Sequence, residues 1–379
     1  GKHIERVLVP AHTPLPSDST PLQLIRARHA VVPFEDPSEF LKLRQWVLNP
    51  TNALNGAVSS GGMDIAAAVV TGVGGSGKTR LAVELCHDLS AKGWYTGFLP
   101  TTTDVTNEEL LALTELITEL LVVVDYAEEG QRGLLAKMFR ILQNRRSPTR
   151  IVLTARGADT WWDDFREEME QDGIDLSNTL VISNLGKKHQ EVDRGLFREI
   201  YRRAVLSFSN AMTKSVPRGI DVPEELGDTA LDAVLRAWLV VCNEGTGTEE
   251  KMPTRNDLYD SVLAIEFSQW RKTPALAEIS MNHLFRAAAT LSLLAPNQDE
   301  DEVDEVLSRL PEWEHEHLRR SRFAELLVHT LLRTDSGDPM CLQPDPVAEH
   351  LILTVFGKRP DLLDRVLPCN PMEAVGIGN

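Results

Sequence analysis

The chain has 379 residues, of which 42% are hydrophobic, and its 56 acidic and 39 basic residues give a formal net charge of −17. This length accommodates two or three domains, and the apolar fraction is sufficient for their cores. So acidic a surface repels nucleic acid and anionic membranes, and we expect neither as a direct partner. Its four cysteines lack metal or disulfide spacing, which indicates free thiols and a cytoplasmic protein.

The first part of the chain predicts little regular structure. Residues 10–21, PAHTPLPSDSTP, are rich in Pro, Ser and Thr, so we assign residues 1–30 to a linker or N-terminal extension. Residues 31–48 predict a short extended piece, a turn and an amphipathic helix. Because the chain begins with Gly1 rather than Met, we expect that flanking domains lie outside it.

A glycine-rich loop follows the apolar run AAVV and precedes the amphipathic helix KTRLAVELCHDLS. Residues 72–79, GVGGSGKT, fit the pattern G-x-x-x-x-G-K-S/T. In this pattern backbone N–H groups face phosphate oxygens, the lysine reaches the β- and γ-phosphates, and the hydroxyl residue binds Mg²⁺. We therefore predict an ATP or ADP site with Mg²⁺ on Thr79; the nucleotide-binding residues are Gly72, Gly74, Gly75, Ser76, Gly77, Lys78, Thr79 and Arg80.

Beyond this loop, predicted strands alternate with predicted helices. The sequence favours strands at 94–100, 120–124 and 149–155, with a helix at 106–119 that Thr106 caps. Such alternation is typical of an α/β fold with a parallel sheet, and with the loop it predicts a P-loop NTPase core.

Acidic residues follow the apolar run LLVVV. Asp125 stands at its end, where a phosphate-loop enzyme needs a carboxylate to hold Mg²⁺. Glu128 and Glu129 come three and four residues later, and either could orient the attacking water; we favour Glu128 as the catalytic residue. Arg156 follows the run TRIVLTA, so we expect its guanidinium near the γ-phosphate, where it would distinguish ATP from ADP.

From about residue 190 the pattern becomes helical, with 3.6-residue periodicity in several long segments. The last part, from FAELLVHTLLRT to PVAEHLILTVF, predicts helix, break, short strand and helix, which is compatible with a small winged-helix unit. We therefore expect a nucleotide-binding domain at 31–190, a helical domain at 191–275 and a winged-helix-like domain at 276–379.

These motifs together resemble the STAND class of signalling P-loop NTPases, which includes the NACHT and NB-ARC proteins. GVGGSGKTRLA is similar to their phosphate loop, LLVVVDYAEE to the NACHT form of the second motif, and VLTAR to the first sensor. The segment VVPF resembles the one whose backbone borders adenine in bacterial multidomain members, so the resemblance implies adenine contacts at Val32 and Pro33.

The resemblance also implies a function. It implies a slow, regulatory ATPase whose core closes over ADP and forms a homo-oligomer with ATP, with effector and sensor domains elsewhere in the same protein. An alternative is an initiator-type ATPase that acts on DNA through its winged helix. The helix after residue 345 carries too few basic residues to favour that alternative, and a small-molecule kinase would leave the helical residues unexplained.

Overall fold

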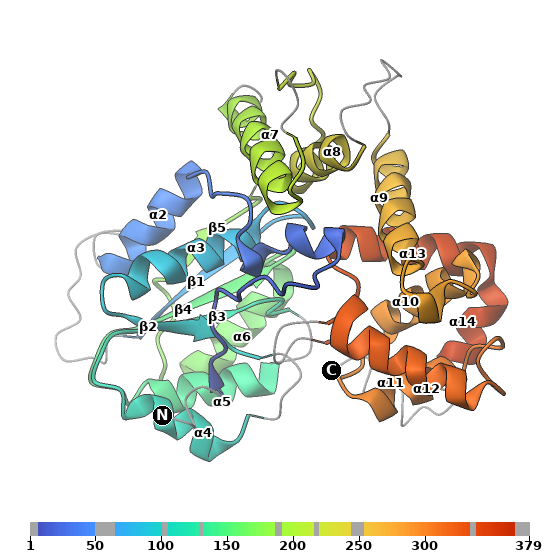
Figure 1. Ribbon diagram of the computed structural model, residues 1–379. Coiled ribbons are helices and arrows are strands. Elements are labelled where there is room, and N and C mark those ends of the chain that lie inside the picture. The colour runs from blue at the N-terminus through green and yellow to red at the C-terminus, as the bar shows by residue number, and fades with distance from the viewer. Residues whose placement is uncertain are drawn as a thin grey trace. The chain divides into compact units, whose positions relative to one another are not determined.

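The computed structural model (Figure 1) describes residues 7–49, 65–100, 105–128, 132–185, 192–215, 220–243, 254–333 and 339–367. Its described residues form two compact units. Gly1–Thr13 and Phe34–Gln190 belong to the first unit, and Pro14–Pro33 and Glu191–Gly378 belong to the second.

A five-stranded parallel sheet forms the centre of the first unit, with strand order β2-β3-β4-β1-β5. The strands are β1 (Ile65–Thr71), β2 (Tyr95–Phe98), β3 (Leu120–Val124), β4 (Thr149–Ala155) and β5 (Leu180–Ile182). All residues of β3 and β4 are buried, as expected of parallel strands covered on both faces. This α/β core agrees with the fold class predicted from the sequence.

Helices cover both faces of this sheet (Figure 1). α2 (Ser38–Leu48) and α3 (Lys78–Ser90) pack into one core cluster. α4 (Asn107–Thr114), α5 (Arg132–Leu142) and α6 (Asp159–Gln171) pack into the other. The chain leaves β1 toward the β2 edge over one face and leaves β4 toward β5 over the other, as right-handed crossovers require.

Residues 7–13 pack onto the first unit. Val9 exchanges two backbone hydrogen bonds with Phe98 at the end of β2, each 2.9 Å long. A Cβ on Gly97 would lie 2.9 Å from the Val9 carbonyl oxygen, so only glycine allows this close approach. Val7 and Leu8 are buried beside it.

The second unit is built from helices around one buried cluster. Its short 3₁₀ helices are η1 (Pro21–Ile25), η2 (Ala27–His29) and η4 (Pro274–Leu276), and a short π-helix, η5, spans Leu327–Leu331. Its α-helices are α7 (Val192–Ala211), α8 (Ala230–Cys242), α9 (Arg255–Trp270), α10 (Met281–Leu294), α11 (Glu300–Ser308), α12 (His317–Leu326), α13 (Asp345–Lys358) and α14 (Pro360–Val366).

Residues 14–33 belong to this helical unit, and the boundary between the two units, after Thr13, lies within the segment 10–21 that was expected to be a linker. Residues 21–23 make the following contacts with the rest of the unit, and the linker or extension at residues 1–30 stays a prediction. The Trp238 indole N–H donates to the Pro21 carbonyl at 2.8 Å, and the Leu22 N–H donates to the Glu266 carboxylate at 2.9 Å. The Gln23 side chain donates to the Thr330 carbonyl at 2.9 Å. Proline and serine content indicated flexibility, but Leu22 and Leu24 supply the buried apolar area that anchors the segment.

In the described residues of 276–379, regular structure is helical and contains no strand. Buried side chains from Phe197 to Val366 join in one core cluster, which extends across the domain boundary expected at residue 275. The winged-helix part of the expectation and that boundary therefore stay predictions. Within the described residues, no helix has the length and apolar character needed to cross a membrane.

Candidate nucleotide-binding site

The predicted site residues of the first unit meet at the carboxyl edge of the sheet. Thr71 pairs with Ala155 and Val124 pairs with Leu153, so β1 and β4 end at the same level and β3 ends two residues before them. The connections from β1 and β4 run to opposite edges of the sheet over opposite faces. Ligands of open α/β sheets bind at such a switch point, beyond the strand ends.

The loop between β1 and α3 has the conformation of a phosphate cradle. Gly77, the N-cap of α3, has a φ of 97°, which is left-handed and favours glycine. A Cβ on Gly72 would lie 2.7 Å from Ser76 Oγ and 2.8 Å from the Leu185 carbonyl oxygen. Gly72 is therefore required for space and Gly77 for backbone conformation.

Lys78 lies inside this loop and is 8% exposed. Its Nζ donates to the Gly72 carbonyl oxygen at 2.7 Å and to the Val73 carbonyl oxygen at 3.3 Å. Ser76 Oγ is buried and makes no hydrogen bond within the described segments. A buried ammonium group and an unsatisfied hydroxyl in one loop fit an anionic ligand, because phosphate oxygens accept hydrogen bonds from both.

Asp125 links the end of β3 to α3 and β4. Its Oδ2 accepts from the Thr79 hydroxyl at 2.8 Å, and its Oδ1 accepts from the Thr154 hydroxyl at the end of β4. The carboxylate is 8% exposed, so these hydroxyls hold it in one orientation. A hydroxyl and a carboxylate at contact distance are the protein groups that Mg²⁺ uses beside nucleotide phosphates.

Glu128 is fixed to the end of β4. Its Oε1 accepts from the Arg156 main-chain N–H at 2.6 Å, while its Oε2 is buried and makes no hydrogen bond with any described residue. The contact uses the backbone of Arg156, whose side chain is exposed. The guanidinium contact with the γ-phosphate stays a prediction, and Glu129 lies outside the described residues.

The remaining predicted residues are placed as follows. The Arg80 guanidinium donates to Glu84 at 3.0 Å and lies 5.2 Å from the centre of the Phe34 ring. Val32 packs against the core of the second unit, to which Pro33 also belongs. The adenine contacts of Val32 and Pro33, and a nucleotide contact of Arg80, stay predictions.

The donor set fits a magnesium nucleotide rather than a metal held by protein alone. No group of three or more His, Cys, Asp or Glu side chains in the described segments has metal-binding geometry. Mg²⁺ keeps several waters and is usually bound by one or two protein groups plus phosphates. Thr79 and Asp125 supply that number of protein groups.

Sequence reasoning missed two residues of the site. Thr154 lies in the predicted strand 149–155, but its contact with Asp125 depends on the order β3-β4, which the sequence did not specify. Leu185 limits the space above Gly72 from a segment more than 100 residues later in the chain. No local pattern marks such a contact.

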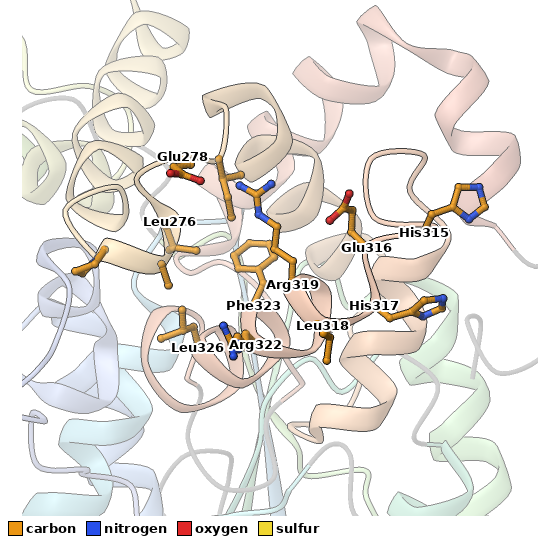
Figure 2. A pocket seen from close by; sticks show the side chains of 13 residues that line it. Leu276, Glu278, His315, Glu316, His317, Leu318, Arg319, Arg322, Phe323 and Leu326 are labelled. Atoms are coloured by element: carbon orange, nitrogen blue, oxygen red, sulfur yellow. The ribbon is translucent and has the colours of Figure 1, made fainter.

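A separate hollow of about 730 Å³ lies in the second unit between η4 and α12 (Figure 2). Leu276, Phe323 and Leu326 form apolar parts of its wall, and Arg319 and Glu278 add charged groups. None of the predicted site residues lines it. The hollow is therefore not part of the candidate nucleotide site.

No protein-family model matches the chain, and no curated protein matches it. Among solved structures it is similar to the Aeropyrum pernix ORC2 protein in ADPNP-ADP complexes, with 14% identity and a TM-score of 0.36 over 89% of this chain and 98% of that one. It is also similar to Cdc6p from Pyrobaculum aerophilum, with 14% identity and a TM-score of 0.32 over 89% and 98% of the two chains. A Drosophila ORC structure with poly(dA/dT) DNA and Cdc6 gives 13% identity and a TM-score of 0.35, over 91% of this chain and 61% of that one.

The parallel sheet and the loop geometry give the first unit the fold of a P-loop NTPase. Identities of 13–14% and TM-scores of 0.32–0.36 carry no argument about function, so the function proposed for this chain is argued from its own residues.

One expectation about partners is corrected. We expected from the net charge that nucleic acid is not a partner, but a structure similar to this chain is that of an ORC bound to DNA. The exclusion was wrong because net charge sums over the whole chain and does not describe one face. α12, for example, carries the exposed residues Arg319 and Arg322 on a chain of net charge −17.

Proposed function

We propose that this protein binds ATP and ADP with Mg²⁺ and hydrolyses ATP at the carboxyl edge of its parallel sheet. The observation that carries the proposal is the grouping of Lys78, Thr79 and Asp125 around a glycine cradle. Two buried polar atoms there, Ser76 Oγ and Glu128 Oε2, make no hydrogen bond among the described residues. A nucleotide and its attacking water would supply their partners.

Each group has a distinct task in this proposal. Lys78 exchanges its two loop carbonyls for phosphate oxygens, which form stronger, charge-assisted hydrogen bonds. Thr79 and Asp125 hold Mg²⁺, which supplies neutralisation of the charge that develops on the phosphates. Glu128 orients the attacking water through the carboxylate oxygen that is not bound to Arg156.

Two finer functions are compatible with this site. In a STAND-like switch, nucleotide state would control the protein and turnover would be slow. In an initiator-type ATPase, the helical second unit would contact DNA. The two functions share the nucleotide site and differ in the partner of the second unit. One experiment therefore tests the nucleotide site for both, and a second experiment distinguishes between them.

The first test is calorimetric titration of the whole chain with ADP and ATP in Mg²⁺. Wild type should bind both nucleotides, and Lys78→Ala should lose binding because it removes the one full positive charge inside the loop. Lys42→Ala on α2 removes an exposed lysine from the same unit and should bind like wild type. Equal affinity of Lys78→Ala and wild type would refute the site.

The second test separates the finer functions. Fluorescence anisotropy with a labelled double-stranded oligonucleotide, at 50 mM and 200 mM salt, measures DNA binding. Salt-sensitive binding that depends on ATP would support the initiator type. Absence of DNA binding, together with Arg156→Ala that weakens ATP but not ADP, would support the nucleotide switch.

A further inference from the structure

Tyr126 has a φ of 54°, in the left-handed region that residues other than glycine rarely adopt. Ala30 and Ala295 share this conformation, but they cap the ends of helices, where it is common. Tyr126 instead lies in the turn after β3, between Asp125 and Glu128. Unusual backbone conformations persist where the surrounding structure holds them, and they cluster at functional sites.

The left-handed residue decides where the next two residues point. In an extended strand side chains alternate, so residues three apart such as Asp125 and Glu128 face opposite sides of the sheet. The turn at Tyr126 cancels this alternation and brings the chain back toward β4. The Ala127 N–H then donates to the Thr154 carbonyl at 2.9 Å, and Glu128 accepts from the Arg156 N–H at 2.6 Å.

Both acidic residues are thereby fixed to the end of one strand. Thr154 holds Asp125 through its hydroxyl and Ala127 through its carbonyl. Arg156 holds Glu128 through its main-chain N–H. Because the second oxygen of Glu128 is buried and has no hydrogen-bond partner in the part of the chain that the structure describes, this arrangement leaves one acceptor available to a water molecule or ligand.

We propose that Tyr126 is a positioning residue: its left-handed backbone places Glu128 beside Asp125, and the backbone conformation rather than the phenol ring performs this task. The inference rests on the proposed ATPase function. It assigns Arg156 a main-chain role in the same site, independent of what its guanidinium does.

The test is a series of substitutions that separates backbone conformation from side-chain chemistry. Tyr126→Phe removes the hydroxyl, Tyr126→Asn and Tyr126→Gly remove the ring but tolerate the left-handed region, and Tyr126→Val disfavours that region through its branched Cβ. Tyr95→Val in β2 is the matched control, because it makes the same change in an extended strand.

Steady-state ATP hydrolysis and calorimetric ADP affinity are measured for each variant. We expect Tyr126→Val to lower kcat about tenfold or more with ADP affinity within about twofold of wild type. Tyr126→Asn and Tyr126→Gly should keep kcat within about threefold, because they retain access to the left-handed backbone. If Tyr126→Val does not fold, Tyr126→Thr supplies a smaller β-branched residue for the same comparison.

Several outcomes would overturn the inference. Equal loss of kcat in the Asn, Gly and Val variants would assign the role to the ring, and normal kcat in Tyr126→Val would remove the role altogether. A parallel fall of ADP affinity and kcat would indicate general damage to the site. Failure of wild type to bind nucleotide would instead refute the proposed function, so the two failures are distinguishable.

Discussion

Replacement of Gly72 by alanine tests the close packing over the phosphate loop. The added Cβ would lie 2.7 Å from Ser76 Oγ, 2.8 Å from the Leu185 carbonyl oxygen and 3.2 Å from the Leu185 Cβ. Ser76 can rotate its hydroxyl, but the Leu185 carbonyl is main chain. The Leu185 N–H donates to the Thr71 carbonyl at 2.7 Å, so the segment after β5 cannot retreat without loss of that bond.

The magnitude follows from this crowding. Insertion of a methyl group into a well-packed position costs about 1–3 kcal/mol. If the segment at Leu185 stays in place, the loop itself must shift, and the shift separates the backbone N–H groups from the phosphates. A cost of that size in the bound state lowers nucleotide affinity by about 5- to 150-fold.

Calorimetric titration with ADP and thermal unfolding of the free protein measure the two parts of this cost. Gly133→Ala is the matched control, because Gly133 is exposed on α5 and no heavy atom of the described residues, its chain neighbours and its own helical backbone aside, lies within 4 Å of its added Cβ. The control should gain about 0.5–1 kcal/mol of stability as a helical glycine replaced by alanine, and bind ADP normally. Wild-type ADP affinity and unfolding temperature in Gly72→Ala would refute the packing argument.

Further predictions concern the metal site, the base, the N-terminal segment and a buried acid. Asp125→Ala should lose Mg²⁺-dependent hydrolysis but keep ADP binding, by phosphate release and calorimetry, because Thr79 and Thr154 lose their shared acceptor while the loop remains. Glu128→Gln should bind ATP and Mg²⁺ but hydrolyse slowly in a single-turnover assay; normal turnover would move the role to another residue. Gln23→Ala should lower stability in urea by about 1–3 kcal/mol, since it removes buried hydrogen bonds to Thr330 and Leu331, whereas exposed Gln45→Ala should not. Burial raises the pKa of Glu266 above 4.5, so its protonated form favours the folded state; wild type should lose stability relative to Glu266→Gln as the pH rises above 4.5, and a constant difference would contradict this.

The grouping of the candidate site residues at one edge of the sheet was predictable from the sequence, because these residues directly follow apolar runs. Thr71, Val124 and Ala155 end parallel strands, and the carboxyl ends of such strands meet at one edge. The residues that follow them, Gly72 and Asp125, therefore had to lie near each other. The helical nature of the second unit was also predictable, since its segments show 3.6-residue periodicity.

The placement of residues 14–33 was not predictable in this way. Local composition reports on flexibility, and PAHTPLPSDSTP has the proline and serine content of a linker. What holds the segment is a set of partners more than 200 residues away in the chain, among them Trp238 and Glu266. No periodicity within the segment encodes those contacts.

The left-handed backbone of Tyr126 could not be predicted from the sequence, for a different reason. Glycine and asparagine indicate a left-handed backbone because they adopt this conformation readily, whereas tyrosine favours an extended strand. The sequence predicted the end of the strand at residue 124, but no residue type after it indicated a left-handed backbone at Tyr126. Hydrogen bonds from Ala127 and to Glu128 offset the unfavourable local conformation. A sequence pattern locates the two acids, but only the backbone at Tyr126 decides whether they act on the same ligand.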